Sequence, residues 1–76
     1  MRYRHYNCGE VSLFILGSDI ESITTAKEMF PTFFMHKPTN FGMVGIESFI
    51  PSEKLENLEK FPCFVVKADG ALRAWA

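Results

Sequence analysis

The apolar residues of this sequence fall into short runs, and turn-forming residues separate one run from the next. Residues 11–16 are apolar on both of their alternating sets, as in a central strand that is covered on both faces. Residues 2–7 alternate without a clearly apolar face, which predicts an edge strand. The pattern therefore places a buried strand directly after an exposed one.

Two segments have the spacing of amphipathic helices. Ser18 and Glu21 form a capping box, so we expect the first helix to begin there and to end before Pro31. Its expected buried residues are Ile20, Ile23, Ala26, Met29 and Phe30. A shorter helix is expected after Pro51, with Ser52 as its N-cap and with Leu55, Leu58 and Phe61 buried.

The remaining apolar runs have the character of strands. Residues 32–37 are expected to form one, residues 38–42 a tight connection, and residues 43–50 the next strand. Residues 63–68 and 71–75 flank Asp69-Gly70, a strong signal for a two-residue hairpin turn. That turn would place Phe64 opposite Trp75.

The resulting order is ββαββαββ, and its middle six elements resemble the βαββαβ order of ferredoxin-like domains. We therefore expect one α+β domain over residues 1–76, built on a single-layer, mainly antiparallel sheet. In this arrangement residues 2–7 add an extra N-terminal edge strand and the C-terminal run adds a hairpin strand. Two short helices would cover one face.

Composition narrows the possible partners. Eight Lys and Arg stand against nine Asp and Glu in 76 residues, a formal net charge of -1. Proteins that bind nucleic acid or anionic lipid through bulk charge usually carry a marked positive excess. No apolar run approaches the roughly 20 residues that cross a bilayer, and no signal-peptide pattern is evident. We expect a cytoplasmic protein without membrane association.

The cysteines and histidines, namely His5, Cys8, His36 and Cys63, match a Cys2His2 metal set in number. Zinc sites usually pair their ligands at short spacing, and here only His5 and Cys8 are close in sequence. A disulfide between Cys8 and Cys63 is the other alternative, although disulfide frameworks belong mainly to secreted chains. Reduced thiols and no metal or cofactor are the expectation.

The sequence offers few residues that could act together as a nucleophile, acid or base. Cys8, beside Gly9, is the better placed nucleophile, but no neighbouring residue supplies its base. Glu53, Glu56 and Glu59 line one side of a short helix, where a solvated face is the ordinary arrangement. We expect no enzymatic activity.

Two surfaces are candidates for binding a partner. The N-terminal strand concentrates arginine and tyrosine, which are enriched in binding hot spots, although charges on an edge strand also prevent unwanted pairing. The other surface combines an aromatic residue in the 38–42 connection with the chain end. The candidate residues are Arg2, Tyr3, Arg4, Tyr6, Phe41, Arg73 and Trp75.

These features favour a small non-catalytic protein-binding module, a regulator or inhibitor that occludes a larger protein partner. Chains this short are often accessory proteins, including those of phages and mobile elements. The alternative is a single-stranded nucleic-acid binder that uses the sheet face, with stacking and phosphate contacts from Arg2, Tyr3, Arg4, Tyr6, Arg73 and Trp75. Unpaired strand edges and a small core also predict a homodimer.

Overall fold

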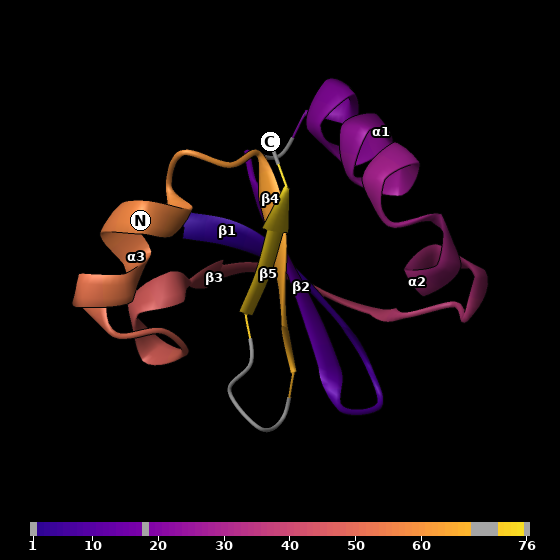
Figure 1. Cartoon of the computed structure of the whole chain (residues 1–76). Helices are drawn as coiled ribbons and strands as arrows, with labels where there is room; N and C mark the ends of the chain where they lie inside the picture. Colours follow the sequence, from indigo (N-terminus) through magenta and orange to yellow (C-terminus); the bar gives the residue numbers. More distant parts are fainter. Residues whose placement is uncertain (1, 18, 68–71, 76) are drawn as a thin grey trace.

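The computed structural model describes residues 2–17, 19–67 and 72–75. Within these residues, five strands, three α-helices and one 3-10 turn form a small α+β domain (Figure 1). In chain order they are β1 (Arg2–Cys8), β2 (Val11–Leu16), α1 (Ile20–Met29), α2 (Pro31–Met35), β3 (Thr39–Gly45), η1 (Ile46–Ser48), α3 (Ser52–Leu58), β4 (Cys63–Lys67) and β5 (Leu72–Trp75).

The strands form one sheet in the order β3-β1-β2-β4-β5, and every neighbouring pair is antiparallel. The expected ferredoxin-like order is not confirmed. The edge position predicted for residues 2–7 is wrong, because β1 lies between β2 and β3. A tight turn at Gly9, which has a φ of 60°, folds β2 back onto one side of β1, and β3 pairs with the other side.

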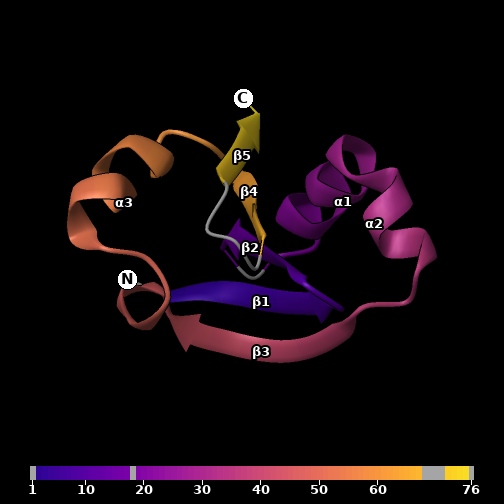
Figure 2. The same cartoon turned by 60° about the horizontal axis from the view of Figure 1, so that its bottom comes forward.

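Helices cover both faces of the sheet, so the prediction of helices on one face is wrong. Figures 1 and 2 show α3 on one side of the strands and α1 with α2 on the other. The reason lies in β2, where the consecutive residues Leu13, Phe14 and Ile15 are all buried. Successive side chains of a strand point to opposite faces, so both faces need a cover. The doubly covered strand expected at 11–16 is confirmed.

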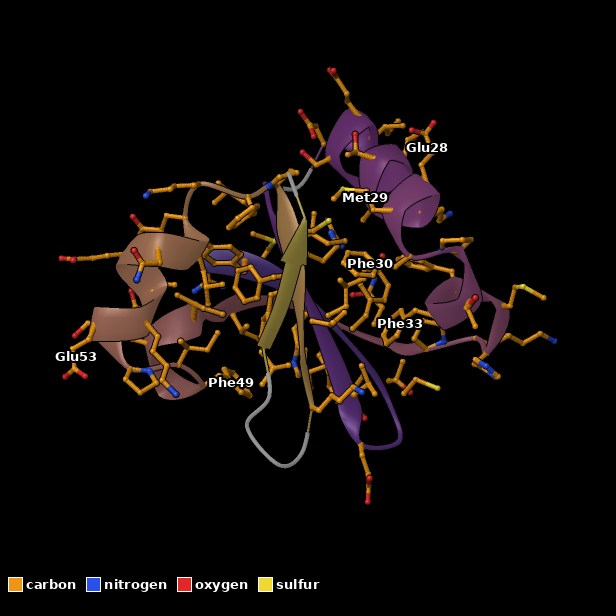
Figure 3. All side chains as sticks on the ribbon, in the orientation of Figure 1. Glu28, Met29, Phe30, Phe33, Phe49 and Glu53 are labelled. Carbon is orange, nitrogen blue, oxygen red and sulfur yellow. The ribbon has the colours of Figure 1, made fainter. Side chains whose placement is uncertain are left out.

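Each face has its own apolar core. The α3 side, which we call the Tyr3 face, is built from Tyr3, Phe14, Ile46, Ile50, Leu55, Leu58 and Phe64. The α1 side, the Leu13 face, is built from Leu13, Ile15, Ala26, Phe30, Cys63 and Val65. In Figure 3 the labelled Phe30 and Phe33 lie on the Leu13 face, and Phe49 lies on the Tyr3 face. Two thin cores therefore share one sheet.

The segment expected as a strand at 32–37 is instead helix α2. Pro31 ends α1 and is also the first residue of α2, a position where its fixed φ and missing N–H suit a helix. The aromatic run after it looked like a strand, because aromatic residues favour strands when only local preference is considered. Packing of Phe33 and Phe34 against the Leu13 face overrides that preference.

Strand β3 begins earlier than predicted, inside the expected connection at 38–42. His5 lies opposite Gly42, whereas Tyr6 lies opposite Asn40, so Phe41 is an extra residue in a β-bulge. Gly42 has a φ of 75°, and its amide donates to Asn40 Oδ1 at 2.8 Å. The glycine and asparagine that suggested a loop therefore form an irregularity within a strand.

The two helix starts differ from the predicted caps. The N-cap of α1 is Asp19, whose Oδ1 accepts from the Ser22 amide at 2.9 Å, and the predicted cap Ser18 lies outside the described residues. The N-cap of α3 is Pro51, with no side-chain cap hydrogen bond, so Ser52 is the first helical residue instead. In both helices the observed N-cap lies one residue away from the predicted one.

The predicted burial of the two helices is confirmed only in part. Ala26, Phe30, Leu55 and Leu58 are buried as expected. Ile23, Met29 and Phe61 are only half-buried, and Ile20 is 83% exposed. Ile20 is the first residue of α1.

Strands β4 and β5 pair antiparallel as expected, but their register differs from the predicted one. Phe64 lies opposite Ala74, and Trp75 lies opposite Cys63. A shift of one residue places a side chain on the other face of a sheet, so the predicted Phe64–Trp75 pair is wrong. Asp69 and Gly70 lie outside the described residues.

Candidate functional site

Four ring side chains meet on the Tyr3 face and form what we call the His5 cluster: His5, Phe14, Phe41 and Phe49. The imidazole stacks on Phe14 with 4.7 Å between ring centroids and 11° between planes. Phe41 stacks on it at 5.2 Å and 24°, and Phe49 contacts it at 5.1 Å with a tilt of 58°. The imidazole is thus surrounded by carbon rings.

Strand register brings these rings together. His5 and Phe14 are direct partners in the β1–β2 ladder, and their side chains share the Tyr3 face. On the other side of β1, the bulge in β3 places Phe41 against the same imidazole. Phe49 follows η1 and reaches the cluster from a third direction. Three strands and one turn therefore contribute a ring each.

Two members of the cluster are largely solvated. Phe41 is 57% exposed and Phe49 is 50% exposed, whereas Phe14 is buried. We call the two exposed rings the aromatic patch. Phe41 was a candidate from the sequence, but Phe49 was missed, because it lies within the segment expected to be a strand at 43–50. Its apolar character was the only local signal.

The His5 side chain is buried, and one of its two ring nitrogens is buried without a polar partner among the described residues. Only 7% of its surface is exposed, and its Nε2 has no hydrogen-bond partner among the described residues. Burial penalises the charged form and lowers the pKa of His5 below its usual value of 6.5. The imidazole is therefore neutral at pH 7.

The candidate residues of β1 lie in several environments. Tyr3 is completely buried in the core of the Tyr3 face. Tyr6 is half-buried on the Leu13 face and meets Phe34 edge-on at 5.4 Å. Arg4 is half-buried, and Arg2 is exposed with its Nη2 donating to the Met43 carbonyl at 3.0 Å.

The candidates at the chain end belong to β5, but the side chains of Arg73 and Trp75 lie outside the described residues. Tyr6 and Phe41 lie on opposite faces of the sheet. Of the seven predicted residues, Phe41 is therefore the one that the described structure places in an exposed aromatic contact.

The four possible metal ligands do not come together. His5 is on the Tyr3 face, whereas Cys63 is on the Leu13 face with its Sγ 3.6 Å from Met29 Sδ. Cys8 Sγ donates to the His36 carbonyl at 4.0 Å. Both cysteines are free thiols, and burial raises the pKa of Cys63 to about 11. The described residues contain no group of three or more His, Cys, Asp or Glu arranged to hold a metal ion.

The edge of the sheet at β3 is irregular. Thr39–Gly45 contains no ionisable residue, which would allow another strand to approach. The bulge at Phe41 interrupts this edge, however, and the Arg2 guanidinium donates a hydrogen bond to the carbonyl of Met43. Bulges and charged groups are devices that prevent strand addition at a sheet edge.

No protein-family model matches the sequence, and no curated protein or solved structure matches it either. Within the part of the chain that the structure describes, no helix has the length and apolar character required to span a membrane.

Proposed function

We propose that this chain is a small non-catalytic protein-binding module that regulates or inhibits a larger protein by covering part of its surface. The observation that carries the proposal is the aromatic patch. Phe41 and Phe49 come from separate elements, converge on one imidazole and remain at least half exposed. Large aromatic side chains are typical of the centres of protein interfaces.

The area of the patch fits a binding role. A phenylalanine buries about 150 to 250 Å² when fully covered, so each half-exposed ring leaves roughly 100 Å² of apolar surface in water. A partner that covered both rings would gain a free energy of several kcal/mol at about 25 cal/mol per Å². Neighbouring residues would complete the contact area and exclude water.

Side chains, rather than strand pairing, are the proposed means of contact. A partner strand would otherwise add at the β3 edge. The bulge at Phe41 interrupts that edge, and the Arg2 guanidinium is hydrogen-bonded to the Met43 carbonyl there. Phe41, at the same bulge, remains 57% exposed. A homodimer that buries the two patches against each other is the competing occupant, and the experiment below separates it from a larger partner.

The alternative function, binding of single-stranded nucleic acid, has weaker support. Such proteins stack bases on aromatic residues of an open sheet face. Here helices cover both faces of the central strands, and Tyr3 is buried within one of the cores. The aromatic patch carries no arginine or lysine of its own.

The test compares three forms of the immobilised chain in a lysate of the source cells. They are the wild type, the patch variant Phe41→Ser/Phe49→Ser, and the control Ile20→Ser/Met35→Ser, which removes two residues of 83% and 79% exposure elsewhere on the molecule. We expect the wild type and the control to recover one protein in stoichiometric amount. The patch variant should lose it, with an unchanged circular dichroism spectrum.

Recovery of the same proteins by all three forms, or of none at high loading, would refute the proposal. Sedimentation equilibrium of the three forms at high micromolar concentration identifies a homodimer, which would dissociate only in the patch variant. Titration with labelled oligonucleotides at low salt checks the alternative, since nucleic-acid binding weakens steeply as salt increases.

A further inference from the structure

Three phenylalanine rings contact the His5 imidazole in an arrangement that we call the aromatic box. Phe14 lies on one of its faces and Phe41 on the other, and Phe49 contacts both the imidazole and Phe14. Nε2 is buried and has no hydrogen-bond partner in the described part of the chain. A neutral ring nitrogen tolerates this environment, but a protonated ring has two N–H donors and a positive charge that need water or an acceptor.

Only one side of the box can open. Phe14 is buried in the core and is packed against Phe64 at 5.7 Å, so it cannot move without disrupting the sheet. Phe41 and Phe49 are at least half exposed and sit on irregular backbone, a bulge and the residue after a 3-10 turn. These two rings form the wall between His5 and solvent.

The surrounding charges do not compensate a proton on His5. Strands β2 and β3 contain no ionisable side chain, and neither does the segment 49–51 after η1. On β1, Arg4 points to the opposite face, and Tyr3 shares the face but is a neutral phenol. Glu59 at the end of α3 and Glu47 of η1 carry charges that act on the Tyr3 hydroxyl, and Glu53 of α3 points outward (Figure 3). Burial is the cause of the shift in His5.

We propose that His5 is a pH-sensitive switch. Its protonation in mildly acidic solution displaces Phe41 and Phe49 and opens this side of the domain. Protonation replaces a neutral ring that stacks well with a cation that must reach water. The displaced rings and the newly uncovered part of Phe14 then enlarge the apolar surface. This switch is a property of the isolated chain and does not depend on the proposed function.

The sign of the effect follows from linkage. In the closed state the pKa of His5 is below 6.5, whereas in the open state the imidazole is solvated and regains its usual value. The open state therefore binds more protons, and acidification favours it. Between the two pKa values the opening equilibrium increases by up to tenfold for each pH unit. Above about pH 6.5 it is constant.

The test is a proton NMR titration of the whole chain from pH 8 to pH 4, combined with native-state hydrogen exchange. The two histidine ring signals are assigned with His5→Phe and His36→Gln. His36 is the matched control, because it is exposed at the end of α2. We expect the His5 midpoint to lie below 6.5, because burial disfavours its charged form. Protection of the amides near Phe41 and Phe49 should decrease as His5 becomes protonated, by up to tenfold per pH unit.

The His5→Phe variant keeps an aromatic ring in the box and should have pH-independent protection at these amides. His36→Gln should behave as the wild type. A His5 midpoint at or above 6.5 would overturn the proposal, because the charged ring would then be stable inside the closed box. The same conclusion follows if protection near the patch stays constant while His5 titrates in the wild type, a readout that does not require any variant to fold.

Discussion

The imidazole of His5 lies almost parallel to the ring of Phe14, with 4.7 Å between the ring centroids. Phe14 also contacts Phe49 at 5.3 Å and Phe64 at 5.7 Å. This one pair therefore joins the exposed aromatic patch to the buried core of the Tyr3 face. Substitutions in the patch and in the core should consequently have different costs.

We expect Phe14→Ala to lower the free energy of unfolding by about 3 to 5 kcal/mol, because it leaves a cavity in the core of the Tyr3 face. Phe41→Ala removes a ring of the same size that is already 57% exposed, and should cost at most about half as much. Urea unfolding monitored by circular dichroism measures both. Phe14→Leu preserves the comparison if the alanine variant does not fold. Equal costs at the two positions would contradict the described burial.

At Tyr3 we expect a substitution that does not lower the free energy of unfolding. Its hydroxyl is buried and has no hydrogen-bond partner among the described residues. An unsatisfied buried polar group costs roughly 1 to 3 kcal/mol, so Tyr3→Phe should leave stability unchanged or increase it by about 1 kcal/mol. Loss of more than about 1 kcal/mol on removal of this hydroxyl would show that it has a partner.

The stability of the wild type should also respond to alkaline pH through Tyr3. Burial, followed by the charges of Glu59 and Glu47, raises the pKa of Tyr3 above its usual value of 10.0. Above about pH 10 the unfolded chain loses this proton while the folded chain keeps it, so the free energy of unfolding decreases. Tyr3→Phe lacks this term. Its advantage over the wild type should therefore grow above pH 10 and stay constant below it, as urea titrations at several pH values would measure.

The bulge in β3 depends on Gly42. Its φ of 75° lies in the left-handed region, where an L side chain costs about 1 to 2 kcal/mol. A Cβ at this position would meet nothing within 4 Å, so Gly42→Ala isolates the backbone effect. The matched control is Gly45→Ala, because Gly45 has an ordinary φ of -78°. We expect the first variant to lose about 1 to 2 kcal/mol and the second less than about 0.5 kcal/mol, measured by urea unfolding.

Local patterns identified several elements correctly. The double apolar set of 11–16 predicted a strand covered on both faces, and the helical spacing of Leu55 and Leu58 predicted a buried stripe, both as observed. These features depend on residues close in sequence, whose period reports which side chains are buried. The prediction of helices on one face was inconsistent with the double apolar set of 11–16. A strand apolar on both sides requires cover on both.

The sequence alone determined a small α+β domain, the position of its buried central strand, and Phe41 as a candidate surface aromatic. Only the tertiary structure decided that β1 is an inner strand, that Pro31 starts a helix, that Tyr3 is buried, and that Phe49 joins Phe41 around His5. These outcomes depend on which strands pair and in which register, and a shift of one residue changes the face of every side chain. Pairing joins residues far apart in the chain, so no local period encodes it.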